Sequence, residues 1–241
     1  MAWKRCLTCA ATALLLAACG APPRHPQPAL APPVEAAAPP PPPGVTAYRV
    51  DPGASEVRLE VYRDGTLARL GHDHVIQNHE LSGWGVLAGA GEPARFYLEI
   101  PVAAFVIDDP LARAEAGPGF EDEVPADAKA GTRANMLGAR LLDAAQYPSI
   151  RISGAIRNAG GADASGSVDI RIAGRDAALA VPIMLNAGAD FVSVSADFPL
   201  QQSALGLTPV SVMLGALQVR DEFHVRLRIV ARRSGESARQ E

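Results

Sequence analysis

The chain has 241 residues with a formal net charge of −4, and 48% of its residues are hydrophobic. A mildly acidic chain lacks the basic surface that holds nucleic acid, so we expect no nucleic-acid partner. The three cysteines are Cys6, Cys9 and Cys19. The chain after Cys19 therefore forms no disulfide, and its folded part must be stabilised by a hydrophobic core alone.

Residues 1–18 have the features of a secretory signal peptide. Lys4 and Arg5 precede an uncharged stretch at 7–18, which is too short for a membrane-spanning helix, since that needs about 20 apolar residues. The stretch ends in Leu-Ala-Ala-Cys at Cys19, which resembles the lipobox of bacterial lipoproteins. The resemblance implies that Cys19 carries the lipid that anchors the protein in the cell envelope. Gly20 at the next position favours the outer membrane, with the protein facing the periplasm.

Residues 19–44 form a separate, proline-rich segment. Eleven of the 22 residues at 22–43 are proline. Proline fixes φ and has no amide proton, so this segment can form neither a helix nor a central strand. We expect a polyproline-II tether between Cys19 and the folded domain, with a rise of about 3.1 Å per residue.

From residue 45 to residue 233 the sequence repeatedly alternates between apolar and polar side chains. The clearest stretches are 56–61, 96–100, 168–172 and 223–229. A period of two predicts strands with one buried and one solvated face, as in antiparallel sheets. We predict an all-β domain at 45–233 that closes into a barrel of about eight strands, because closure removes exposed edges. Residues 234–241 would be a polar tail.

Two stretches break the alternation. Residues 108–127 contain seven acidic residues and three prolines, which predicts an exposed loop. Residues 127–146 contain good helix formers with apolar side chains at helical spacing, and Tyr147-Pro148 follows. Because the residue before a proline disfavours the helical conformation, we predict one helix at 127–146 that has a break near Gly131 and ends at Tyr147-Pro148.

Four stretches of the domain occur in a characteristic order and spacing. They are 48–57, 136–150, 166–182 and 198–207. Together they resemble the YceI-like family of lipocalin-like, polyisoprenoid-binding proteins. The resemblance implies an extended antiparallel β-barrel with a helix near one end, whose apolar interior takes up an isoprenoid chain or an isoprenoid quinone. The Gly-His-Asp-His sequence at 71–74 is a further signature that marks a subgroup.

The apolar residues of the alternating strands are the candidate ligand-binding residues. They would face the barrel interior, where they either line a cavity for an apolar or amphiphilic ligand or pack together into a solid core. A lined cavity would suit an envelope lipoprotein that carries or sequesters such a ligand. The fifteen candidates are Val57, Leu59, Val61, Phe96, Leu98, Ile100, Ile150, Ile152, Val168, Ile170, Ile172, Phe223, Val225, Leu227 and Ile229.

A histidine cluster offers a second hypothesis. His72 and His74 are two residues apart, so their side chains point the same way if the backbone is extended. Imidazole is a ligand for Zn, Cu, Ni or Fe, and a cupin-like metal-binding protein would use His72, His74, His79 or Glu80. A surface-exposed His-Asp-His turn explains the residues without a metal, with or without a role in sensing pH near 6.5. We favour the exposed turn and expect no metal and no cofactor.

Enzyme motifs are missing from the sequence. It contains no Gly-x-Ser-x-Gly elbow and no phosphate-binding loop, and it has no cysteine nucleophile after Cys19. The adjacent acids Asp108 and Asp109 fall in the predicted exposed loop, where they would be solvated. We therefore expect no enzymatic activity. A third hypothesis is a ligand-free structural or stress-related envelope module with a packed core. The oligomeric state stays open.

Overall fold

A computed structural model describes residues 37–89, 92–157 and 164–234. The predicted signal peptide, Cys19, the first part of the tether and all but the first residue of the polar tail lie outside these residues. The described residues all belong to one compact unit.

Within the described residues, thirteen strands form one sheet in which all the strand pairs are antiparallel. The strands are β1 (Ala47–Val50), β2 (Glu56–Asp64), β3 (His74–Asn78), β4 (Ser82–Val86), β5 (Ala94–Pro101), β6 (Val106–Ile107), β7 (Ser149–Arg157), β8 (Ser165–Ile172), β9 (Arg175–Pro182), β10 (Met184–Ala187), β11 (Phe191–Gln201), β12 (Ser211–Val212) and β13 (Leu217–Arg233).

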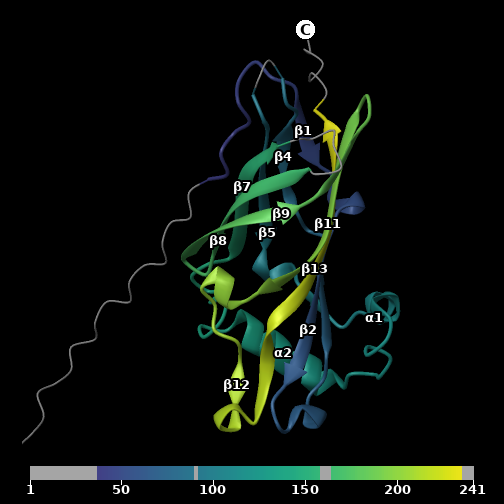
Figure 1. Ribbon diagram of the computed structural model, residues 1–241, viewed down its shortest axis with the longest axis vertical. Coiled ribbons are helices and arrows are strands. Elements are labelled where there is room, and N and C mark those ends of the chain that lie inside the picture. Colours follow the sequence, from purple (N-terminus) through teal and green to yellow (C-terminus); the bar gives the residue numbers. More distant parts are fainter. Residues whose placement is uncertain (1–36, 90–91, 158–163, 235–241) are drawn as a thin grey trace, which may run out of the picture. The chain divides into compact units, whose positions relative to one another are not determined.

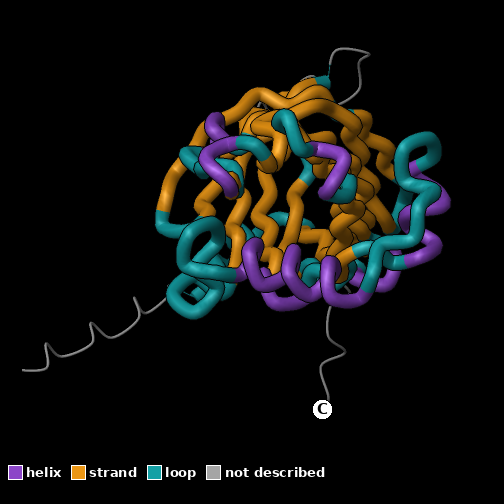
Figure 2. The backbone as a smooth tube through the Cα atoms, turned by 90° about the horizontal axis from the view of Figure 1, so that it is seen from below, coloured by secondary structure: helices purple, strands orange, loops and turns teal. Residues whose placement is uncertain are grey.

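The sheet is organised around β13, which is 17 residues long. One edge of β13 pairs with β11, and the other pairs first with β2 and then with β1. From β1 the sheet continues through β4, β5, β7 and β8 to β9, and β9 contacts β11. The sheet therefore curls round on itself (Figures 1 and 2). The predicted all-β, lipocalin-like antiparallel barrel is confirmed. Eight strands make the ring, and β2, β3 and β6 extend its wall.

The strand register fixes which side chains face the interior. Leu98 of β5 lies opposite Ile152 of β7, which lies opposite Ile170 of β8. Because side chains alternate between the two faces of a strand, this register gathers one apolar residue from each strand on the inner face.

Five 3-10 helices and two α-helices interrupt the sheet in the described residues. The 3-10 helices are η1 (Pro52–Ala54), η2 (Ala68–Leu70), η3 (Val102–Ala104), η4 (Ser203–Leu205) and η5 (Met213–Gly215), and the α-helices are α1 (Pro110–Ala116) and α2 (Ala126–Leu137). No helix in the described ranges is long and apolar enough to cross a membrane.

The prediction of an exposed loop at 108–127 is wrong. The carboxylate of Asp109 caps α1 by accepting hydrogen bonds from two backbone amides, and Pro110 occupies the first turn, both of which favour helix initiation. Ala112 and Phe120 are buried against Val75 of β3. Most of the acidic residues of this stretch are exposed, but Asp108 is buried. The buried apolar residues Ala112 and Phe120 cover the outer face of the barrel.

The outer face is also less solvated than the alternation predicts. Glu60 and Tyr97, expected in water, are buried. The ring of Tyr62 lies 6.0 Å from that of Phe120, and its hydroxyl donates a hydrogen bond to Glu60 at 3.1 Å. Burial, followed by this contact with Glu60, raises the pKa of Tyr62 to about 12.

The predicted helix at 127–146 is shorter in the structure, because α2 ends at Leu137, and the predicted break near Gly131 is wrong, because α2 continues through that residue. Gly138 caps α2 in an extended conformation, which glycine adopts readily and which stops the helix. The amides of Leu142 and Ala144 then turn back to bond the carbonyls of Met136 and Leu137. This turn brings Leu142 into the core, which a straight helix would not do.

Candidate functional site

The barrel encloses an apolar cavity of about 480 Å³. This volume lies within the range of about 300–1,000 Å³ that is usual for small-molecule sites. Strands on all sides of the ring contribute apolar side chains to the wall. The barrel therefore has a lined cavity. The alternative of a solid core, which the sequence allowed, does not describe this structure.

All fifteen predicted interior residues line this cavity. Some, such as Val57 and Phe223, are buried, whereas Leu98, Ile152 and Ile170 are only half-buried because they face the empty space. That these residues bind a ligand stays a prediction. Further apolar lining residues that were not predicted come from β9, β11, η4 and the residues just after η4. They are Leu179, Val181, Phe198, Leu200, Leu205 and Leu207. The alternating pattern at 175–182 could have predicted that Leu179 and Val181 face the interior. No pattern in the neighbouring sequence predicts that Leu205 does so.

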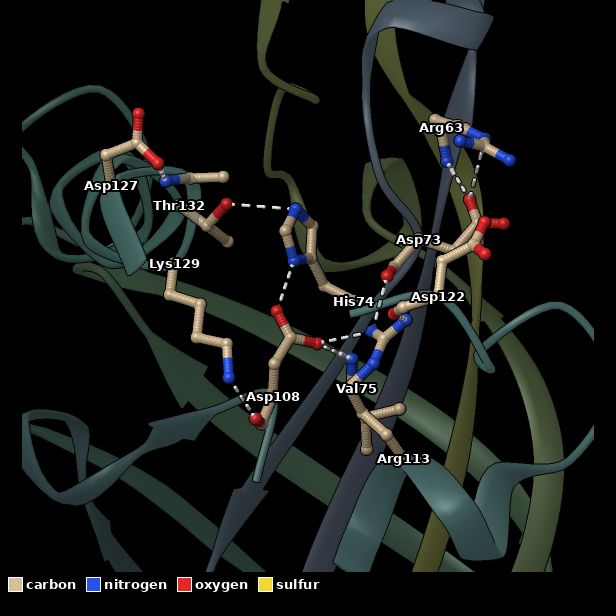
Figure 3. A network of polar contacts seen from close by, with 11 residues as sticks. Arg63, Asp73, His74, Val75, Asp108, Arg113, Asp122, Asp127, Lys129 and Thr132 are labelled. Atoms are coloured by element: carbon tan, nitrogen blue, oxygen red, sulfur yellow. Dashed lines mark hydrogen bonds and ion pairs between the residues drawn. The ribbon is translucent and has the colours of Figure 1, made fainter. Parts of the chain in front are cut away.

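Polar side chains also reach the cavity wall, where β2 ends and β13 begins. They include Arg63, His72, His74, Thr132 of α2 and Gln218. Close by, a buried polar network joins β3 to α2 and to the segment before α1 (Figure 3). The cavity thus has apolar walls and a polar group of residues toward one end.

His74 and Asp108 form the centre of this network. Nδ1 of His74 lies 2.6 Å from Oδ2 of Asp108, and Nε2 lies 3.0 Å from the hydroxyl oxygen of Thr132 (Figure 3). Oδ1 of Asp108 accepts hydrogen bonds from the amide of Val75 at 2.9 Å and from the guanidinium of Arg113 at 2.7 Å. Both oxygens of the carboxylate and both nitrogens of the imidazole therefore have partners.

Arg113 and Lys129 extend the network through backbone carbonyls. The guanidinium of Arg113 donates to the carbonyls of Asp73 at 2.8 Å and Asp122 at 2.9 Å, while the ammonium of Lys129 donates to the carbonyl of Asp108 at 2.8 Å. These bonds fix α1 and α2 against the end of β3, which closes one side of the cavity.

Asp108 is ionised in this environment although it is only 1% exposed. Burial acts to raise the pKa of Asp108, but the hydrogen bonds from His74 and Val75, together with Arg113, outweigh burial and hold the pKa below its ordinary value. A carboxylate only accepts hydrogen bonds, so Nδ1 of His74 carries the proton that points toward it. The expectation that Asp108 is solvated is wrong, because its partners come from a strand and a helix that the sequence did not place beside it.

The structure separates the four residues of the metal hypothesis. The rings of His72 and His74 are near each other, with centroids 6.3 Å apart, but His79 follows the other end of β3, where Nδ1 contacts the carbonyl of Ser55 at 3.1 Å. Glu80 is exposed. Among the residues that the structure describes, no group of three or more His, Cys, Asp or Glu side chains is arranged to hold a metal ion. The side chain of His74 is only 13% exposed, so the prediction of an exposed turn is wrong for His74.

Thr132, His74 and Asp108 place a hydroxyl, an imidazole and a carboxylate in a row. Some hydrolases use the same arrangement to activate a nucleophile. Here its evident effect is structural: Thr132 is on α2, His74 opens β3, and Asp108 follows β6. The row therefore joins three elements around one end of the cavity. Thr132 and His74 also line the cavity, which places them within reach of a bound molecule.

Comparison with known proteins finds a shared fold. No family model and no curated protein matches the sequence. The crystal structure of Burkholderia cenocepacia BcnA is similar, with a TM-score of 0.54 and 18% identity over 76% of this chain and 99% of that chain. A Campylobacter jejuni YCEI protein has a TM-score of 0.45 and 11% identity over 65% of this chain and 82% of that chain. At 18% identity, the likeness to BcnA is one of fold.

Proposed function

We propose that this chain is an envelope lipoprotein of the YceI-like kind, whose barrel binds an apolar or amphiphilic ligand such as an isoprenoid or quinone for carriage or sequestration. The observation that carries this proposal is the apolar cavity of about 480 Å³ inside the barrel. An apolar chain that leaves water for such a cavity gains about 25 cal/mol for each Å² of apolar surface removed from water. The polar residues toward one end suit an amphiphile, whose head would lie there while its tail follows the walls.

The tether and Cys19 supply the membrane anchor in this proposal. The first described residues support a tether that joins the barrel beside β1, because Nε1 of Trp84 donates a hydrogen bond to the carbonyl of Pro39 at 2.7 Å. An extended tether of roughly 25 residues reaches about 75 Å, and β13 with its 17 residues is about 55 Å long. The tether would therefore allow either end of the barrel to reach the membrane that holds Cys19. The barrel would face the periplasm, with its lipid in the outer membrane.

We further propose that binding involves no covalent chemistry and no metal. The network around Asp108 holds the helices in place, and its imidazole is already engaged at both nitrogens by protein groups. The polar residues at the cavity then select and orient a ligand rather than react with it.

Mass spectrometry of the purified protein tests this function. The chain purified from its native envelope would be measured under native conditions, and the same sample would be extracted with organic solvent and analysed for metals. We expect an apolar molecule at close to one equivalent and metal far below one equivalent. Stoichiometric metal would favour the metalloprotein, and an empty protein that also takes up no added isoprenoid would favour the ligand-free module.

A further inference from the structure

One end of the barrel carries a group of exposed apolar side chains. We call residues 65–71, which include η2, and residues 210–217, which include η5, the tip. Leu70, Val212, Met213 and Leu214 are exposed there, and Leu214 is fully so. The two segments meet, because the amide of Leu67 donates to the carbonyl of Ala216 at 2.7 Å. Adjacent exposed apolar side chains of this size mark interaction surfaces.

The backbone of the tip is in an uncommon conformation at two of these side chains. Met213 and Leu214 have φ of 52° and 55°, in the left-handed region, and Gly215 follows with φ of 90°. Bulky residues adopt this conformation rarely, because Cβ comes too close to the following carbonyl oxygen. Gly65 packs so closely on the carbonyls of Gly215 and Ala216 that a Cβ there would clash. This contact holds Gly215 and Ala216 against the segment that contains η2, while Met213 and Leu214, which precede them in the chain, are exposed to solvent.

The tip is continuous with the cavity. Val210, Val212 and Leu217 belong to the tip and also line the cavity, as does Gly71. Val212 is both exposed and part of the cavity wall, and Met213 follows it in the chain. Apolar side chains therefore continue from the exposed surface of the tip into the wall of the cavity.

The charge of the tip suits a phospholipid surface. Arg69 is its only charged residue, it is exposed, and it lies next to Leu70. Arg63, at the end of β2, lines the same end of the cavity, but its guanidinium pairs with Asp73 at 3.8 Å, so Arg69 carries the free positive charge of this end among the described residues. Apolar side chains beside a basic residue bind the boundary between headgroups and acyl chains, and the charge of Arg69 adds attraction to an anionic surface.

We propose that the tip inserts Leu70, Met213 and Leu214 into the headgroup boundary of a bilayer, so that the ligand passes between membrane and cavity along Val212 without crossing water. This inference rests on the proposed function, since it assigns the entrance of the same cavity. The tip lies at the Leu217 end of β13, whereas the tether joins beside β1, which pairs with Arg233 at the other end of that strand. The tip therefore lies at the opposite end of β13 from β1, where the described part of the tether joins the barrel.

A single fluorescent label tests the insertion. The chain from Gly20 onward retains every described residue and has no cysteine, so Leu214→Cys provides one site for an environment-sensitive nitrobenzoxadiazole label. Met184→Cys is the control, because Met184, like Leu214, is an exposed apolar residue but belongs to β10, away from the tip. The vesicles would contain phosphatidylethanolamine and phosphatidylglycerol.

We expect a blue shift on addition of vesicles for the label at 214 and none at 184. Met213→Asp with Leu214→Asp should weaken vesicle binding at least tenfold, while Met184→Asp leaves it unchanged. Equal responses at both positions, or none at 214, would overturn the inference. A shift at 214 that grows with protein concentration and needs no vesicles would also overturn it, because a second copy would then cover the tip.

Uptake of a soluble apolar fluorophore without vesicles separates this inference from the proposed function. The tip variants should bind the fluorophore as the parent chain does. If the parent chain binds it and no vesicle response occurs, the inference fails and the function stands. If the parent chain binds no fluorophore, the proposed function itself fails, and the inference fails with it.

Discussion

The cavity wall and the polar network around Asp108 lie next to each other but are built in different ways. The wall consists of many apolar side chains, each of which contributes a part of the surface and faces empty space. The network consists of a few groups in fixed geometry, in which each carboxylate oxygen and imidazole nitrogen has a partner. Changes to the wall should therefore affect binding more than stability, and changes to the network should do the reverse.

The largest effect on stability is expected for Asp108→Ala. It leaves the guanidinium of Arg113 buried without its carboxylate, and loss of one partner of a buried ion pair costs about 3–5 kcal/mol. Urea denaturation would measure the free energy of unfolding. Asp109→Ala is the control, because Asp109 caps α1 from an exposed position, and loss of a cap costs about 1 kcal/mol. Equal losses for the two variants would mean that the network does not stabilise the fold as we describe.

A large side chain inside the cavity should weaken ligand binding with less effect on stability. Ile170→Trp points an indole into the cavity from β8, and we expect the affinity for N-phenyl-1-naphthylamine to fall at least tenfold, which is about 1.4 kcal/mol. Asp169→Trp places the same side chain on the outer face of β8 and should bind as the parent chain does. Fluorescence titration of both variants measures the effect. Unchanged affinity in Ile170→Trp would place the binding site elsewhere.

The same contrast explains what sequence alone could predict. The fifteen wall residues follow from a local period of two, which depends only on neighbours in the chain. The network depends on contacts across the fold, because Asp108 meets His74 from 34 positions earlier in the sequence. The many acidic residues of 108–127 led to the prediction of a loop in place of α1. Asp109-Pro110 is nevertheless a typical start of a helix. Gly138 was likewise a legible stop for α2.

Acid should destabilise the fold through Asp108. Its pKa is lowered in the folded state, so the stability that its ionised form contributes is present above its ordinary pKa of about 3.9. This contribution is lost as the pH falls below about 4 through the lowered pKa. Unfolding measured by urea between pH 2 and 6 should depend less on pH in Asp108→Asn than in the parent chain. Asp51 supplies part of the remaining dependence, because its hydrogen bond with Arg232 also lowers its pKa.

The smallest effect is expected for Thr132→Val, which removes one hydroxyl from the row of Thr132, His74 and Asp108. The lost hydrogen bond to His74 costs about 1 kcal/mol of unfolding free energy, and Thr132→Ser should restore most of it. A fluorophosphonate probe should leave Thr132 unlabelled, as peptide mass spectrometry would detect. Labelling that disappears in Thr132→Val would instead identify a nucleophile and contradict a role limited to binding.

Energy transfer from Trp84 tests most directly whether the cavity binds an apolar ligand. Trp84 lines the cavity, and it is the only tryptophan after Trp3. In the chain from Gly20 onward, N-phenyl-1-naphthylamine would be titrated while the emission of Trp84 and of the fluorophore is recorded. We predict saturable transfer at one equivalent, which an added isoprenoid quinone reverses by competition. A lack of saturable transfer, or transfer that the quinone does not reduce, would contradict a cavity that binds isoprenoid-like ligands.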